Sequence, residues 1–174
     1  MAVLSFSQPH WGARSASFFV LALLSYGALG QQLVTWRGDP TPALMLEDMK
    51  GNSINLATLR GKTVLINFWA TWCVPCVEEM PSIQNLKARL TQEKFEVLAV
   101  NVGESKERVE AFLKKVPVNF FILFDPQGDA SRTWKVRGFP TTFILGPDGR
   151  IRYYHVGDLD WSQETIVDRV KGIR

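Results

Sequence analysis

The sequence predicts an α/β fold in which a mixed central β-sheet is flanked by helices. Residues 63–69 form a nearly continuous apolar run rich in β-branched and aromatic side chains, which is typical of a buried strand. A Cys-Val-Pro-Cys motif follows at 73–76, where a helix is expected to begin. A chain of 174 residues suits one folded domain of this kind.

Residues 1–30 are expected to be a signal peptide or an N-terminal membrane anchor. Arg14 precedes a charge-free apolar run, and Ala28 and Gly30 provide small residues for a signal peptidase. The charge-free stretch continues to Trp36, so insertion of about 20 residues as a membrane helix is the alternative to cleavage. Either outcome places the cysteines in the periplasm or another extracytoplasmic space.

Residues 31–42 are expected to form an extended linker, because prolines and a glycine in this segment disfavour regular structure. The folded domain is therefore expected to span residues 43–174. At its start, residues 43–47 and 53–56 are expected to pair as a hairpin across the turn at Lys50, Gly51 and Asn52.

The rest of the chain alternates strand-like and helix-like segments. Apolar patterns predict strands at 95–102 and 120–124 and helices at 105–116 and 129–134. A turn at 146–149 predicts that residues 141–145 and 151–156 pair as an antiparallel hairpin. A last helix is expected over 162–171, with Asp160 or Ser162 as its N-cap and with three inward-facing side chains: Ile166, Val167 and Val170.

The two cysteines are expected to have different chemical roles. Pro75 suits a first helical turn, and Glu78 and Glu79 are expected to place negative charge near the positive end of the helix. Cys73 would then cap the helix, where unpaired N–H groups favour the thiolate, so it is the expected nucleophile. Cys76 lies one turn further along and is the expected resolving thiol.

Other uses of the cysteine pair fit the composition less well. A structural zinc site needs four ligands, whereas the chain has only these two cysteines, His10 and His155. A structural disulfide closing so short a loop would restrict the unfolded chain little. The 20 basic and 17 acidic residues are scattered, which predicts no nucleic-acid binding. We therefore expect redox exchange by the dithiol itself, with no metal and no organic cofactor.

Two segments resemble a known family. Phe-Trp-Ala-Thr-Trp-Cys-Val-Pro-Cys at 68–76 and Arg-Gly-Phe-Pro-Thr-Thr-Phe at 137–143 resemble the thioredoxin superfamily. Within it, the chain is similar to the exported TlpA/ResA-type reductases associated with cytochrome c maturation, over roughly residues 43 to 174. This resemblance implies a thioredoxin-like sandwich with an N-terminal hairpin and a central strand-helix insertion.

The resemblance also implies roles for further residues. The proline that matches Pro140 is cis in the family and lies against the cysteines, which would leave the backbone of Phe139 free to pair with a client. Trp72 is a candidate for client contact at the same place, although core packing is an equal alternative. Glu79 matches a glutamate that influences the thiols in ResA-type proteins. Plain thioredoxin has a buried aspartate where this chain has Asn67, so Glu79 is the candidate for proton handling.

Together these features predict a monomeric reductase for disulfides in exported proteins such as apocytochrome c, with a membrane thiol carrier as electron donor. Two alternatives remain at the level of the sequence. One is a disulfide oxidase or isomerase of the same fold that uses the same residues. The other is a non-catalytic chaperone that binds apoproteins through the groove at Phe139.

Overall fold

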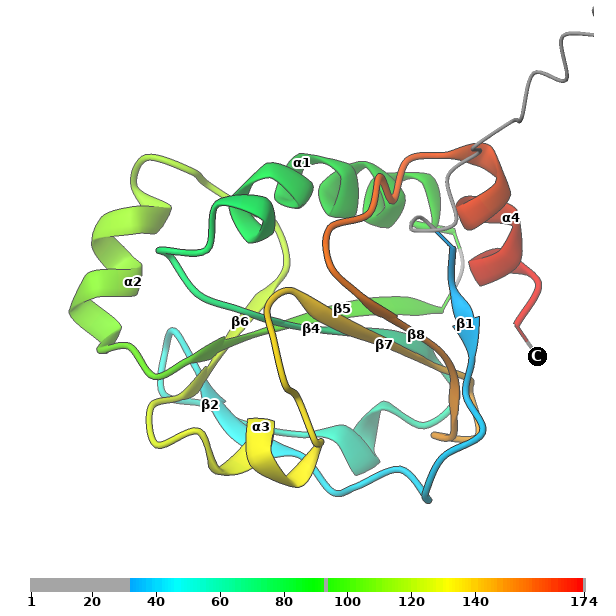
Figure 1. Cartoon of the computed structure of the whole chain (residues 1–174), viewed down its shortest axis with the longest axis horizontal. Helices are drawn as coiled ribbons and strands as arrows, with labels where there is room; N and C mark the ends of the chain where they lie inside the picture. The colour runs from blue at the N-terminus through cyan, green and yellow to red at the C-terminus, as the bar shows by residue number, and fades with distance from the viewer. Residues whose placement is uncertain (1–31, 93, 174) are drawn as a thin grey trace, which may run out of the picture.

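Within the residues that the computed structural model describes, 32–92 and 94–173, eight strands form one mixed sheet in the order β1-β8-β7-β4-β5-β6-β2-β3 (Figure 1). The expected signal peptide or anchor at 1–30 lies outside these residues. The strands are β1 (Val34–Thr35), β2 (Met45–Asp48), β3 (Ser53–Asn55), β4 (Thr63–Trp69), β5 (Phe95–Val102), β6 (Phe121–Asp125), β7 (Thr141–Leu145) and β8 (Ile151–Val156). The helices are α1 (Val74–Arg89), α2 (Lys106–Leu113), α3 (Asp129–Thr133) and α4 (Glu164–Lys171), with a 3-10 helix at Leu56–Leu59.

The centre of the sheet is β4, the apolar strand that precedes the cysteines. It pairs in parallel with β5 on one side and antiparallel with β7 on the other. The register places Trp69 beside Asn101 and Phe68 beside Thr141. The carboxyl ends of β4 and β5 therefore meet the start of β7 at one edge of the sheet, and this edge carries the site described below.

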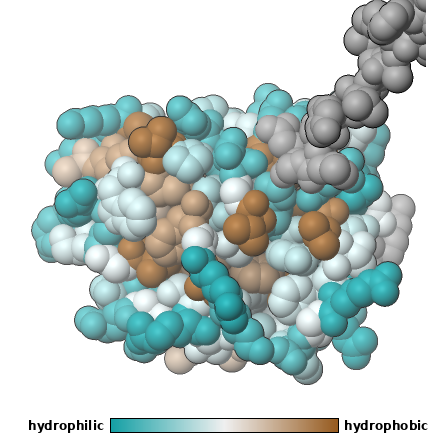
Figure 2. Space-filling model, in the orientation of Figure 1, coloured by the Kyte–Doolittle hydropathy of each residue, from teal (hydrophilic) through white to brown (hydrophobic). Residues whose placement is uncertain are grey.

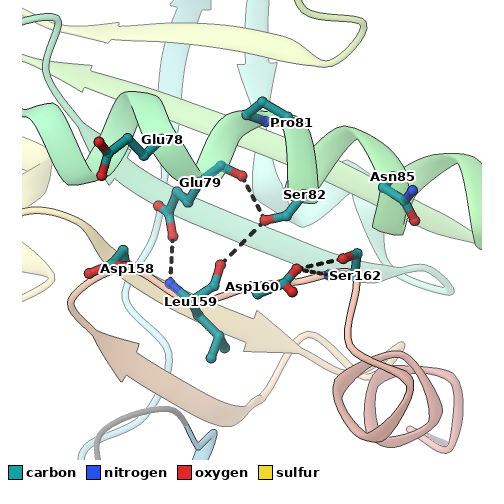
Figure 3. A pocket seen from close by; sticks show the side chains of 9 residues that line it. All are labelled: Glu78, Glu79, Pro81, Ser82, Asn85, Asp158, Leu159, Asp160 and Ser162. Atoms are coloured by element: carbon teal, nitrogen blue, oxygen red, sulfur yellow. Dashed lines mark hydrogen bonds between the residues drawn. The ribbon is translucent and has the colours of Figure 1, made fainter.

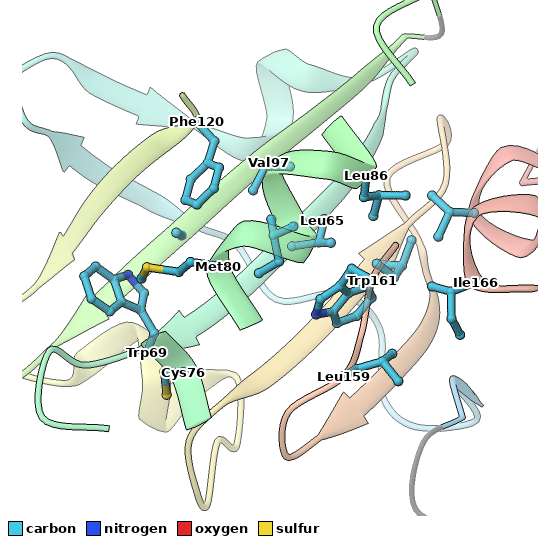
Figure 4. Close-up of a cluster of buried hydrophobic side chains, with 14 of the residues drawn as sticks. Leu65, Trp69, Cys76, Met80, Leu86, Val97, Phe120, Leu159, Trp161 and Ile166 are labelled. Atoms are coloured by element: carbon cyan, nitrogen blue, oxygen red, sulfur yellow. The ribbon is translucent and has the colours of Figure 1, made fainter. Parts of the chain in front are cut away.

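Side chains from β4 enter two separate hydrophobic cores because successive residues of a strand point to opposite faces. Leu65 and Trp69 belong to the core beneath α1 and α4, which Figure 4 shows together with Cys76 and Trp161. Ile66 and Phe68 belong to the core on the side of α3. The sheet is thus covered by helices on both faces (Figure 1), the thioredoxin-like sandwich that the sequence predicted.

Most predicted elements are confirmed. β4 and β5 have the predicted bounds, and β2 pairs with β3 around Gly51, whose φ of 81° explains the glycine in that turn. β7 and β8 form the predicted antiparallel hairpin. The three predicted inward-facing residues of α4 are all buried.

The segment 31–42 is not a simple spacer, which corrects the predicted linker. Val34 and Thr35 form β1 and pair with Tyr154 and Tyr153 of β8. Leu33 is buried in the core beneath α1 and α4. The segment is extended, as its composition predicted, but an extended chain beside the outer strand of a sheet can satisfy that strand's backbone groups.

The predicted helix ends also need correction. Because α1 begins at Val74, its first turn contains no acidic residue, so Glu78 and Glu79 lie in the second turn. α4 begins at Glu164 with Gln163 as N-cap, and that cap makes no side-chain hydrogen bond. Asp160 instead accepts a bond of 3.0 Å from the N–H of Ser162, so it stabilises the turn before the helix.

The predicted helix at 105–116 is shorter in the structure, where α2 ends at Leu113. Its predicted start is confirmed, since Ser105 caps α2 by accepting a hydrogen bond from the N–H of Arg108.

Among the helices of the described part of the chain, none is both long and apolar enough to cross a membrane.

Candidate active site

Cys73 caps helix α1, as the sequence predicted, and forms a disulfide with Cys76. Its Sγ accepts a hydrogen bond of 3.3 Å from the backbone N–H of Cys76. Cys73 is 5% exposed, whereas Cys76 is fully buried. Because both sulfurs sit at the positive end of α1, a thiolate formed on Cys73 would be stabilised there, and of the two cysteines only Cys73 keeps any exposed surface.

Trp72 and Phe139 lie together beside the disulfide. Their rings meet at 64° with 5.9 Å between centroids, and Trp72 is 62% exposed. Trp72 is therefore surface rather than core, while Trp69 is fully buried and packs against Phe112. Hydrophobic surface gathers between α2 and the start of α1, on the left of the face that Figure 2 shows.

The peptide bond between Phe139 and Pro140 is cis, as the resemblance implied. The register of β7 places this bond at the end of β4, next to the loop that leads to Cys73. Pro140 is buried, and its carbonyl oxygen accepts a hydrogen bond from the N–H of Gly157. Among the described residues, no backbone hydrogen bond outside the helices and strands involves Phe139.

Glu79 is buried one helical turn beyond Cys76, with only 3% of its surface exposed. Its carboxylate accepts hydrogen bonds from Asn67 Nδ2 at 2.7 Å, Trp161 Nε1 at 2.9 Å and the N–H of Leu159 at 3.3 Å. Burial raises the pKa of Glu79 to about 7, although the bonds from Trp161 and Asn67 favour the charged form. The carboxylate therefore titrates near neutral pH.

A cavity of about 440 Å³ adjoins Glu79 (Figure 3). Glu79 and Ser82 of α1 both bond to the backbone of Leu159 there, which joins the helix to the segment after β8. Exposed Asp158 and Asp160 form part of the cavity wall. A buried carboxyl group beside such a cavity has a route for exchanging its proton with solvent. Glu78 also lines the cavity and is exposed, as expected.

The carboxylate of Glu79 bonds to groups other than the cysteine sulfurs, which the sequence did not anticipate. Asn67 donates to Glu79 and also, at 2.9 Å, to Thr142 Oγ1. Asn67 therefore has a role of its own, because it orients the carboxylate of Glu79. The sequence had indicated only that Asn67 lacks the charge of the aspartate found in thioredoxin. The one available signal was a polar residue on the core face of an otherwise apolar strand. Trp161 and Leu159 gave no signal, because 82 and 80 positions separate them from Glu79.

The described residues offer no group of three or more His, Cys, Asp or Glu side chains that could hold a metal ion. His155 is buried, with its ring nitrogens 3.2 Å from the carbonyl oxygens of Gln32 and Asp158. His10 lies outside the described residues. The redox centre of this site is the cysteine pair itself.

Comparison with known proteins gives consistent results. The family model described as Redoxin matches residues 37–171. The thiol-disulfide oxidoreductase ResA of Bacillus subtilis is 40% identical over 114 residues, which cover 66% of this chain and 64% of that protein, slightly under two thirds of its length. The ResA of Geobacillus kaustophilus is 36% identical over 137 residues, covering 79% of this chain and 78% of that protein.

A solved structure extends the similarity to three dimensions. The crystal structure of a Chlorobium tepidum protein, assigned as a thiol:disulfide interchange protein DsbE, superposes with a TM-score of 0.71 at 31% identity. The superposition covers 80% of this chain and 97% of that chain. The similarity includes nearly the whole of the solved domain.

Proposed function

This chain belongs to the Redoxin family as a thiol-disulfide oxidoreductase of the ResA/DsbE type, and we propose that it reduces disulfides in exported proteins outside the cytoplasm. The observation that carries the proposal is the asymmetry of the cysteine pair. Cys73 lies at the helix N-terminus and keeps 5% of its surface exposed, whereas Cys76 is fully buried. This arrangement suits attack by the first sulfur and resolution by the second.

In the reduced protein, the Cys73 thiolate attacks one sulfur of the client disulfide. A bond forms between Cys73 and that sulfur, and the other client sulfur leaves as a thiolate. Cys76 then loses its proton and attacks Cys73 Sγ, which releases the second client thiolate and restores the Cys73–Cys76 disulfide. The client gains two electrons and the protein loses two, so a reduced thiol carrier in the membrane is the donor that we propose for the next cycle.

We propose that Glu79 accepts the proton that Cys76 loses during resolution of the mixed disulfide. Residues three positions apart on a helix are neighbours on its surface, and a carboxyl group with a pKa of about 7 suits proton transfer near neutral pH. The adjoining cavity supplies an exit for that proton to solvent. Glu79 thus acts as a general base during resolution, and its carboxyl group releases the proton to solvent before the next client binds.

Client binding is proposed at Trp72, Phe139 and Pro140. An exposed aromatic ring beside the reactive sulfur offers apolar contact area. The backbone of Phe139, which has no backbone hydrogen-bond partner within the described part of the chain, can pair with an extended peptide. Apocytochrome c, which presents a cysteine pair in an unfolded segment, is the client that the family resemblance suggests.

Insulin reduction with dithiothreitol as donor tests the proposed activity. We expect the purified domain to accelerate reduction and Cys73→Ser to abolish the acceleration. Equal behaviour of the two proteins would favour the chaperone alternative.

The reduction potential of the cysteine pair is a second test. We expect a value nearer the roughly −270 mV of thioredoxin than the roughly −120 mV of a strong oxidant, because Val74 and Pro75 add no cation to stabilise a thiolate. A potential near the upper value would assign the protein to disulfide formation.

A further inference from the structure

The loop that leads from β4 to Cys73 is fixed by a side chain from a different part of the chain. Glu104 follows β5, and its side chain is only 4% exposed. Its two oxygens accept bonds of 2.6 Å from the N–H and from the Oγ1–H of Thr71, two residues before Cys73. Asn101 Nδ2 donates to the same carboxylate at 2.8 Å, and Arg108 forms an ion pair with it at 2.8 Å.

Sheet topology brings these residues together. β4 and β5 are parallel and in register, so the loops that follow them leave the sheet at the same edge, on the left of Figure 1. Gly103, with φ of 74°, turns the chain so that Glu104 faces the neighbouring loop. The amide of Asn101 donates to Glu104 through Nδ2, while its Oδ1 is buried without a hydrogen-bond partner among the described residues.

Burial alone would raise the pKa of Glu104. Hydrogen bonds from Thr71 and Asn101, with the charge of Arg108, outweigh burial and hold that pKa below its ordinary value. The carboxylate is therefore ionised at neutral pH and keeps its acceptor sites for the loop. Bonds from donors to an ionised acceptor are among the stronger hydrogen bonds in proteins.

We infer that Glu104 is a positioning residue that holds the loop at Thr71 so that Cys73 keeps its place as N-cap of α1 when the disulfide opens. In the oxidised protein, the covalent bond to Cys76 fixes Cys73 on the helix. When that bond opens, Cys73 itself keeps two backbone hydrogen bonds, from its N–H to Ala70 and from the N–H of Val77 to its carbonyl oxygen. The two bonds between Glu104 and Thr71 then hold the loop that precedes it. The inference rests on the proposed function, since it assumes that Cys73 is the attacking thiol.

Two substitutions separate positioning from charge. Glu104→Gln removes the charge, but its amide oxygen can still accept from Thr71 N–H and Asn101, and its amide N–H₂ can donate to Thr71 Oγ1. Glu104→Ala removes the charge and all of these contacts. Because both variants lose the charge, the difference between them reports the contacts alone. Arg108 is mostly exposed and can turn to solvent in either variant.

The measurement is the alkylation rate of Cys73 in the reduced proteins as a function of pH. We expect the thiolate of Glu104→Ala to form at higher pH than that of Glu104→Gln, so that alkylation on the rising limb is about three- to tenfold slower. Glu96→Gln is the matched control, because Glu96 lies at the opposite end of β5 with its own lysine partners. It should leave the wild-type profile unchanged.

Superimposable profiles for the Ala and Gln variants would overturn the inference, because a merely structural glutamate would lower stability without moving the thiol titration. If Glu104→Ala does not fold, Thr71→Val and Thr71→Ser give the same test without a change of charge, and the Val variant should react more slowly at the same pH. Failure of the proposed function looks different, since Cys73 of the wild-type protein would then support no insulin reduction at all.

Discussion

Trp161 Nε1 donates a hydrogen bond of 2.9 Å to the carboxylate of Glu79. This bond connects the segment before α4 with the helix that carries both cysteines. Both residues are buried, so the carboxylate is held by a donor that belongs to the fold. The protonation state of Glu79 is therefore expected to affect the free energy of unfolding.

Stability should depend on the protonation of Glu79. Its pKa in the folded state, about 7, lies above the ordinary value of 4.5. The folded protein therefore retains a proton that the unfolded chain loses between these two values, and the resulting stabilisation is present below pH 4.5 and lost as pH rises through 7. A shift of this size corresponds to roughly 3 kcal/mol of unfolding free energy.

Urea unfolding of the oxidised protein between pH 4 and 8 should reveal this effect as a difference between the wild type and Glu79→Gln, which cannot titrate. Glu78→Gln is the control, since Glu78 is exposed in the same helix. Parallel pH profiles for the wild type and Glu79→Gln would contradict the assignment of a buried, titrating carboxyl group.

Replacing Trp161 should be more damaging than replacing Trp69, although both indoles are fully buried. Trp161→Phe removes a donor from the Glu79 carboxylate and is expected to lower the unfolding free energy by about 1 to 3 kcal/mol above pH 7. Trp69→Phe makes the same change of ring, but among the described residues Trp69 Nε1 has no hydrogen-bond partner. Its loss should be smaller, and equal losses by chemical denaturation would refute a specific role for the indole bond.

Trp161→Phe should also raise the pKa of Glu79 further, because one hydrogen bond that favours the carboxylate is lost. Carboxyl titration followed by ¹³C NMR would measure the change. Trp69→Phe should leave that titration where it is in the wild type.

Cys76→Ser should accumulate a covalent complex with client proteins. Attack by Cys73 can proceed, but resolution cannot, so the mixed disulfide persists. Mass spectrometry after mixing the reduced variant with an oxidised peptide should show the adduct on Cys73. Cys73→Ser should give no adduct of comparable yield, because Cys76 is fully buried. A stronger adduct on Cys76 would reverse the two assigned roles.

Trp72→Ala should weaken client binding more than thiol chemistry. Losing an exposed aromatic contact of this kind is expected to raise KM for a disulfide peptide by about fivefold or more, equivalent to roughly 1 kcal/mol. Alkylation of Cys73 by a small reagent should hardly change. Met45→Ala is the control, since Met45 is 67% exposed on β2, outside the proposed client site. A matching loss of alkylation rate would show that Trp72 acts on Cys73 itself.

Local patterns explain what could be predicted from the sequence. The apolar run at β4 and the Pro75 that follows define a strand and a helix start within a few residues, so the place of Cys73 follows from neighbours in the chain. The cis bond before Pro140 was available only through resemblance. The structure confirms that the bond is cis, while the client-binding role stays a prediction.

Long-range contacts explain what could not be predicted. Glu79 was singled out, but its partners Asn67 and Trp161 approach from β4 and from the segment after β8, and no spacing in the chain encodes that meeting. Glu104 was not singled out at all, because its bond to Thr71 depends on two parallel strands ending side by side. Val34 and Thr35 were assigned to a linker because only the position of β8 makes them a strand.

That short strand has a consequence for solubility. Without β1, the six-residue strand β8 would become the outer edge of the sheet, with Tyr153, Tyr154 and the 59% exposed Val156 beside unpaired backbone groups. Such an edge is a template for association with another copy through intermolecular strand pairing. The two residues of β1 therefore protect the protein against aggregation. A truncation that begins at residue 37 should self-associate although it keeps both cysteines and all four helices, and it would also lose Leu33 from the core beneath α1 and α4.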